Sequence, residues 1–257
     1  MLFERIRRGQ KPVFLFLAIM FGLGFVALGV GSGAGGINLG DILNSSGGGG
    51  SSISDLQAKT RDHPNDAPAW RQLAAAYQAD GQNDAAIGAY LRYIGLRPKD
   101  QNGLSGAATL LELRARKTQT ELTKAQALAA QYTTPATASA AQSLKLAPSL
   151  THSLQDALAQ PYQTRVQNLQ AHLSSDYLQA TAIRQKLVKL DPKNAPYQFA
   201  LAQDAAAGQQ YSTAATALKA YLDLEPNLDQ TTRQQLESTL KALQSFATSA
   251  PTTPSSP

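Results

Sequence analysis

One stretch of 34 residues, Ala67 to Asp100, constrains the fold more than any other part of the chain. Its first half carries apolar side chains at the spacing i, i+3, i+4 and i+7, which is one face of an α-helix. These side chains are Trp70, Leu73, Ala74 and Tyr77. Gly81 predicts the end of that helix, because glycine adopts the left-handed conformation without steric cost. A second helix is expected from Asn83 to Leu96, before Pro98.

The same spacing occurs again near the other end of the chain. Pro192 and Pro226 are 34 residues apart, and the sequence between them predicts a second, degenerate helix pair. Gln198 stands there at the tryptophan position, and Gly208 is expected at the turn. The other matching positions hold Asn194 as the helix N-cap, Leu201 and Ala202 in the first helix, and Ala214 and Leu218 in the second. One such hairpin cannot bury its apolar face alone, so the pattern predicts stacked hairpins.

The residues between these two hairpins follow the period less closely. Two further helix pairs are expected there, 104–116 with 120–132 and 162–173 with 176–190. The stretch 133–160 does not fit and is interpreted as an insertion with short helices near 138–146 and 151–159. A last helix, 229–246, has one apolar stripe and one polar face, which is typical of a helix that closes a stack.

The 67–100 stretch resembles a tetratricopeptide repeat (TPR), whose signature is W-x2-L-G-x2-Y followed by a small residue, an aromatic residue and a proline. The signature positions hold Trp70, Leu73, Ala74, Tyr77, Ala86, Tyr90 and Pro98. The resemblance implies an all-α fold, a TPR-type α-solenoid of antiparallel helix hairpins, within a helical domain at 55–246. The expected repeats are 67–100, 101–135, 161–193 and 195–228, with the capping helix 229–246.

The beginning of the chain predicts a membrane anchor. Residues 13–30 contain no charged or strongly polar side chain and would span about 27 Å as a helix. Residues 1–12 are basic, which favours a cytoplasmic N-terminus with the helical domain on the other side of the membrane. The alternative is a signal peptide cleaved near Ala34. Residues 31–54 are rich in Gly and Ser, so we expect a flexible linker.

Composition limits the remaining possibilities. The tail 247–257 consists mainly of Ser, Thr, Pro and Ala and is expected to be disordered. The chain carries a net charge of +5, and we interpret its basic clusters, 114–117 and 184–193, as solvated helix faces rather than a nucleic-acid site. It has no cysteine, and none of His63, His152 and His172 has a second ligand at metal spacing. We therefore expect no catalytic site, metal or cofactor.

Protein binding is the function that the resemblance implies. In TPR proteins the first helix of each hairpin lines an inner groove. At those positions this chain has Arg71, Ala75, Gln78, Phe199 and Gln203. We expect a membrane-tethered scaffold or adaptor for protein partners outside the cytoplasmic membrane. The alternative is a chaperone-like or biogenesis subunit that holds client segments during the assembly of envelope proteins or membrane enzymes.

Overall fold

A computed structural model describes residues 51–133 and 148–249 of the chain, and this described part is all-helical, as expected. The predicted anchor 13–30, the basic segment 1–12 and nearly all of the linker lie outside the described residues. No helix within 51–133 or 148–249 combines the length and the apolar character needed to cross a membrane.

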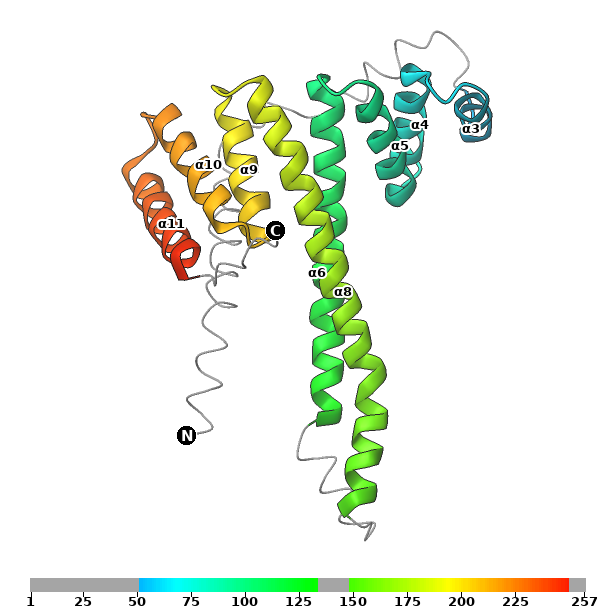
Figure 1. Ribbon diagram of the computed structural model, residues 1–257, viewed down its shortest axis with the longest axis vertical. Coiled ribbons are helices and arrows are strands. Elements are labelled where there is room, and N and C mark those ends of the chain that lie inside the picture. Colours follow the sequence, from blue (N-terminus) through cyan, green and yellow to red (C-terminus); the bar gives the residue numbers. More distant parts are fainter. Residues whose placement is uncertain (1–50, 134–147, 250–257) are drawn as a thin grey trace, which may run out of the picture. The chain divides into compact units, whose positions relative to one another are not determined.

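The chain divides into two compact units by its internal contacts. The smaller unit is Leu111–Asp176, and the larger one comprises the residues before and after it. Two long helices, α6 (Gln101–Thr133) and α8 (Pro148–Leu190), run through both units (Figure 1).

The larger unit begins with α3 (Ile53–Asp62), followed by the hairpin of α4 (Ala67–Ala79) and α5 (Asn83–Leu96). These bounds confirm the two helices expected from the repeat pattern. Gly81 has a φ of +75° between them, which explains why glycine stands at that turn. Ser52 caps α3 by accepting a hydrogen bond from the Asp55 N–H, so the helix begins within the expected linker 31–54.

The same unit ends with a second hairpin, α9 (Ala195–Ala207) and α10 (Tyr211–Leu224), and with α11 (Gln230–Ser249). The second hairpin and the closing helix are confirmed. However, α11 continues three residues beyond the expected 246, so the start of the predicted disordered tail is helical. The rest of that tail lies outside the described residues.

The two hairpins repeat each other at an interval of 128 positions, from residue 67 to residue 195. Their first helices both have 13 residues, and their second helices both have 14. Asp66 and Asn194 cap the first helices through side-chain oxygens that accept backbone N–H bonds of 3.0 and 3.1 Å. The helices before the hairpins also correspond, because α3 ends at residue 62 and α8 ends at residue 190.

A side-chain hydrogen bond is repeated as well. The Trp70 indole Nε1 donates to the Pro64 carbonyl oxygen at 2.9 Å, and the Gln198 Nε2 donates to the Pro192 carbonyl oxygen at 3.0 Å. Glutamine can therefore replace tryptophan at this position, since its amide reaches the same carbonyl group as the indole does.

Gly208 lies at the turn between α9 and α10, as expected, but its conformation differs from that of Gly81. Gly208 has a φ of −81°, and its neighbour Gln209 takes the positive φ of 60° at the position equivalent to Gly81. Gly208 has a packing role instead, because an added Cβ would lie 3.3 Å from the Tyr177 Cβ. The glycine is therefore at the predicted turn, and the residue after it takes the left-handed conformation.

The helix pairs expected in the middle of the chain are wrong. Residues 104–116 and 120–132 belong to the single helix α6, and residues 162–173 and 176–190 belong to the single helix α8. The short helix expected at 151–159 is also part of α8, whereas 138–146 lies outside the described residues. No glycine or proline interrupts 117–119 or 174–175, so nothing in the local sequence breaks these helices. Pro161 lies inside α8 and removes one backbone donor without ending the helix.

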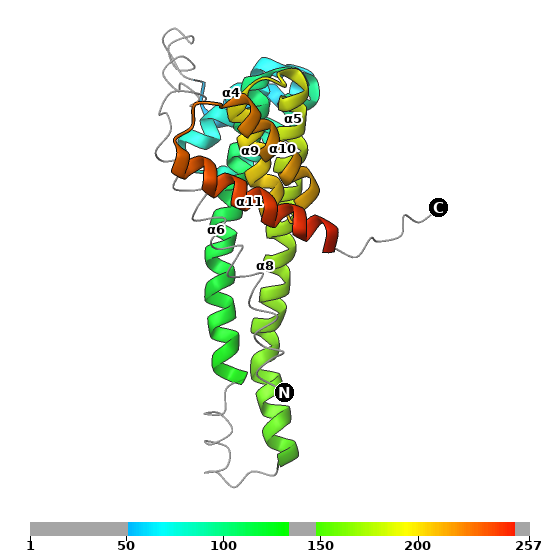
Figure 2. The same ribbon diagram turned by 90° about the vertical axis from the view of Figure 1, so that its left-hand side faces the viewer.

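The smaller unit is an antiparallel hairpin made from the adjoining parts of α6 and α8, which lie side by side in both ribbon views (Figures 1 and 2). Buried and half-buried residues recur at alternating intervals of three and four, which is the seam of a coiled coil. On α6 these are Leu111, Ala115, Thr118, Leu122, Ala125 and Ala129, and on α8 they are Ala159, Tyr162, Val166, Leu169, Leu173 and Asp176. This continuous seam explains why both helices extend beyond one repeat.

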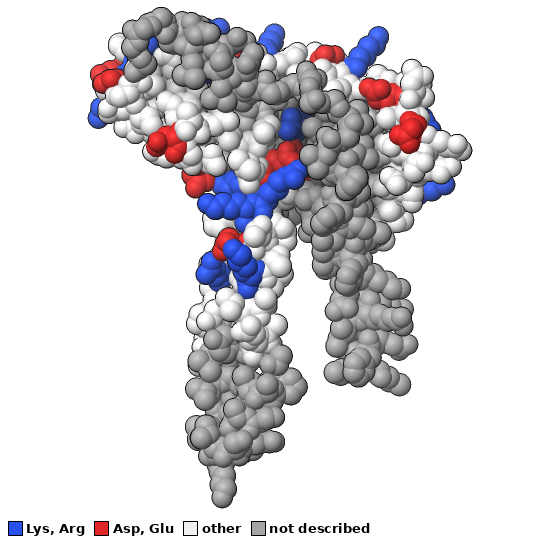
Figure 3. Space-filling model, turned by 180° about the vertical axis from the view of Figure 1, so that it is seen from behind, with Lys and Arg blue, Asp and Glu red and all other residues white. Residues whose placement is uncertain are grey.

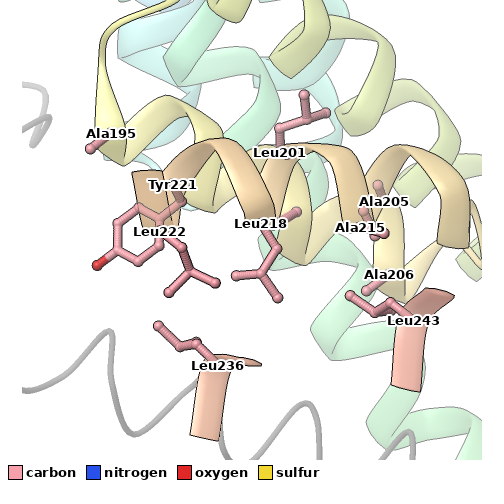
Figure 4. Packing of buried hydrophobic residues seen from close by; sticks show 13 residues of the cluster. Ala195, Leu201, Ala205, Ala206, Ala215, Leu218, Tyr221, Leu222, Leu236 and Leu243 are labelled. Carbon is pink, nitrogen blue, oxygen red and sulfur yellow. The ribbon is translucent and has the colours of Figure 1, made fainter. Parts of the chain in front are cut away.

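The core of the second hairpin is closed by α11 (Figure 4). Leu218 and Leu222 of α10 are buried against Leu236 and Leu243 of α11, and alanines of α9 complete the cluster. Small residues let α9 and α10 approach closely, while leucines fill the space between α10 and α11. The remaining faces of α11 are largely exposed, in agreement with the single apolar stripe of its sequence.

Candidate functional site

The five residues expected to line a binding groove all lie in the larger unit and are all half-buried. Three lie on α4 and two on α9: Arg71, Ala75, Gln78, Phe199 and Gln203. The repeat interval makes Arg71 equivalent to Phe199 and Ala75 equivalent to Gln203. The same helix face therefore carries different side chains in the two hairpins.

On α4 this face is polar. The hydroxyl of Tyr93, on α5, donates a hydrogen bond to the carboxylate of Asp100. Asp100 also caps α6 by accepting the Asn102 N–H at 2.9 Å. Burial and the bond to Asp100 raise the pKa of Tyr93, while the nearby Arg71 guanidinium acts in the opposite direction. Arg71 thus belongs to a polar cluster that joins α4, α5 and the start of α6.

Gly103 allows this cluster to form. A Cβ at this position would overlap the Tyr93 ring, closer than non-bonded carbon atoms can approach. The Tyr93 side chain consequently packs directly on the backbone of α6. No sequence motif marks Tyr93, Asp100 or Gly103 as a group, and the proximity of Gly103 to Tyr93 is visible only in the tertiary structure.

On α9 the equivalent face is aromatic. Phe199 contacts Tyr221 of α10, with ring centroids 4.7 Å apart and planes inclined at 42°. Phe199 also packs against the core cluster of this hairpin. Part of its ring therefore serves folding, and only the half-exposed remainder is available to a partner.

A buried ion pair distinguishes the two hairpins further. The Arg184 Nε lies 3.2 Å from the Asp204 Oδ2, and the side chains are only 8% and 2% exposed. Arg184 was expected on a solvated basic face, and for this residue the prediction is wrong. The equivalent positions hold Leu56 on α3 and Ala76 on α4, which carry no charge.

The smaller unit carries its own ion pairs. Arg114 binds Asp176 with two hydrogen bonds, from its Nε at 3.0 Å and its Nη2 at 2.5 Å. Asp176 is nearly buried, so this contact fixes one end of the hairpin seam. Arg114 therefore also departs from the expected solvated cluster. Glu121 contacts both Lys124 and Arg165, and the Lys124 ammonium lowers the pKa of Glu121.

Basic and acidic side chains are intermixed on the face shown in Figure 3, including on the hairpin of the smaller unit. This pattern differs from the unbroken basic surface that binds nucleic acid. Within the described ranges, no group of three or more His, Cys, Asp and Glu side chains could hold a metal ion.

A shallow groove opens on the first hairpin, away from the five predicted residues. It has a volume of about 380 Å³ and lies between α3, α4 and α5. Its lining consists of Gln57, Thr60, Arg61, Trp70, Leu73, Tyr77, Ala85, Gly88 and Ala89. Trp70 and Tyr77 were predicted as packing residues, but both remain half-exposed in this groove.

Comparison of the chain with protein-family models gave no match, and comparison with curated proteins gave none either.

Proposed function

We propose that this chain is a TPR-type α-solenoid that acts as a membrane-tethered scaffold or adaptor for other proteins outside the cytoplasmic membrane. The observation that carries this proposal is the repetition of a whole hairpin, with its caps and its side-chain bond to a proline carbonyl, at residues 67 and 195. Stacked hairpins present curved helical surfaces, and such surfaces typically bind other proteins.

The chemistry of the repeated face supports selective binding. Arg71 beside Tyr93 and Asp100 offers fixed charge and hydrogen bonding on the first hairpin, whereas Phe199 offers apolar surface on the second. A partner that contacts both hairpins would need acidic or polar groups at one end and an apolar group at the other. This combination favours a defined partner over unselective holding of client segments.

The test is a cross-linked pull-down of the full-length protein from membranes, with mass spectrometry of the captured proteins. The variant Ala75→Glu with Gln203→Glu adds two negative charges to the proposed binding face. Its control, Arg92→Gln with Lys219→Gln, changes the net charge by the same amount at exposed positions of α5 and α10. We expect one or two stoichiometric partners that are lost in the variant and kept in the control.

A broad set of unrelated exported proteins, captured equally by the variant and the control, would contradict the adaptor proposal. It would favour the chaperone-like alternative, in which the surface holds client segments without a defined partner. Melting temperatures of both variants exclude a trivial loss through unfolding.

A further inference from the structure

The groove between α3, α4 and α5 is a feature of the first hairpin. Three residues give it depth and apolar character: Trp70, Tyr77 and Gly88. The equivalent positions of the second hairpin hold Gln198, Ala205 and Thr216. An added Cβ at Gly88 would meet no atom within 4 Å, so the groove is open space at this point.

A short apolar segment precedes α3 in the sequence. Residues 37–43, INLGDIL, interrupt a stretch that otherwise consists mostly of Gly and Ser. Four of the seven side chains are large and aliphatic: Ile37, Leu39, Ile42 and Leu43. A linker needs no such side chains, since Gly and Ser alone give a flexible chain.

The length of the connection lets this segment reach the groove. Leu43 lies ten positions before Ile53, the first residue of α3. A flexible chain of that length has a root-mean-square span of about 17 Å. Gln57, the first residue of α3 that lines the groove, is only four residues further, or about 6 Å along the helix.

The charges are complementary. Asp41 is the only charged residue of the stretch 31–52. Among the described residues that line the groove, Arg61 alone carries a charge. The sequence thus offers an apolar segment with one acidic side chain, and the structure offers an apolar groove with one basic side chain.

We propose that residues 37–43 bind in the groove between α3, α4 and α5 of the same chain. The bound segment covers Trp70 and Tyr77, and Asp41 pairs with Arg61. The connection before α3 is then a docked arm rather than a free tether. This inference does not depend on the proposed partner, and it holds whether residues 13–30 remain as an anchor or are removed near Ala34.

Cysteine cross-linking tests this proposal, because the chain contains no cysteine of its own. The full-length variant Leu39→Cys with Gly88→Cys is treated in cells with a short bismaleimide, and cross-linked peptides are identified by mass spectrometry. The control is Leu39→Cys with Thr216→Cys, at the equivalent position of the second hairpin. We expect at least a several-fold higher yield with Gly88→Cys, because a docked segment stays beside the groove. Equal yields would overturn the proposal.

Mixing isotopically labelled and unlabelled protein tests whether the bound segment belongs to the same chain as the groove or to another copy. Cross-links within one label support docking in the same chain, whereas predominantly mixed cross-links show exchange between copies and contradict it.

Exchanging the charges of Asp41 and Arg61 tests the proposed ion pair. Asp41→Arg alone should lower the cross-linking yield, and adding Arg61→Asp should restore it; no response to either change would exclude the proposed ion pair.

Fluorescence gives an independent readout, because Trp70 is the only tryptophan of the chain. Replacing Leu39 and Ile42 by serine should increase quenching of Trp70 by acrylamide, roughly to the level expected for an uncovered, half-exposed indole. Gly88→Thr should have the same effect by filling the groove, since threonine already stands at the equivalent position of α10. Unchanged quenching in both variants would show that the groove is not covered by residues 37–43.

Discussion

The hairpins α4–α5 and α9–α10 have the same backbone architecture but different interiors and different faces. Helix lengths, N-caps and the side-chain bond to the preceding proline carbonyl are shared. The buried pair Arg184–Asp204 joins α8 to the second hairpin, whereas the equivalent positions hold Leu56 on α3 and Ala76 on α4. Hydrogen bonds between side chains and the backbone are thus common to both hairpins, whereas contacts between side chains of different helices differ.

The largest expected effect comes from breaking the buried ion pair. Asp204→Ala should lower the free energy of unfolding by about 3–5 kcal/mol, because it leaves the Arg184 charge buried without its carboxylate. The double variant Arg184→Leu with Asp204→Ala copies the first hairpin and should recover most of this loss. Urea denaturation followed by circular dichroism measures both. A double variant no more stable than Asp204→Ala would show that the two interiors are not interchangeable.

The second largest effect is expected at the contact between Tyr93 of α5 and Gly103 of α6. Gly103→Ala should lower the free energy of unfolding by about 1–3 kcal/mol, because the new methyl group overlaps the Tyr93 ring. The control is Gly95→Ala on α5, where an added Cβ meets no atom within 4 Å and alanine favours the helix. Thermal melting of both variants is sufficient. Equal melting temperatures would contradict the close packing of Tyr93 on α6.

A smaller effect is expected at the turns. Gln209 has a φ of 60°, and Gly81 has a φ of +75° at the equivalent position. Gln209→Gly should stabilise the second hairpin by roughly 0.5–1 kcal/mol, because glycine avoids the steric cost of this conformation. Gly81→Gln should destabilise the first hairpin by a similar amount. Effects of the same sign in the two hairpins would mean that the turns are not equivalent.

The smallest effect at neutral pH is expected from Tyr93 and Tyr221, which occupy equivalent positions of the two hairpins. Burial raises the pKa of both Tyr93 and Tyr221, and the carboxylates of Asp100 and Glu225 add to it. A raised folded-state pKa means that the stabilisation is fully present below the unfolded value of about 10 and is lost as pH rises through the folded value. The free energy of unfolding should therefore not vary with the titration of these groups around pH 7, and it should fall above pH 10.

The measurement is urea denaturation across this alkaline range, together with tyrosinate absorbance. Tyr93→Phe should reduce the loss above pH 10, since phenylalanine does not ionise. An identical alkaline loss in the variant would show that Tyr93 does not contribute. Tyr221→Phe provides the matched comparison in the second hairpin.

The binding residues proposed from the sequence were only partly distinguished from structural ones. The period identified Arg71 and Phe199 as members of one face, and both are half-exposed. It did not reveal that Arg71 approaches the Tyr93–Asp100 bond or that Phe199 packs on Tyr221. These contacts join residues of different helices, and a helical period describes only one helix at a time.

Local sequence determined the two outer hairpins, because caps, turn glycines and prolines act on their own neighbourhood of the backbone. Asp66, Gly81 and Pro98 set the limits of α4 and α5 without help from distant residues. For the same reason, the sequence supported an all-α fold and the closing helix α11.

Only the tertiary structure decided the middle of the chain. A period of 34 residues suggested two more repeats there, but α6 and α8 continue without a break and pair along a seam of half-buried residues. Alanine, glutamine and threonine favour no particular break, so packing between the two helices determined their length. Tertiary contacts likewise brought Arg184 to Asp204, a pairing of residues 20 positions apart on different helices.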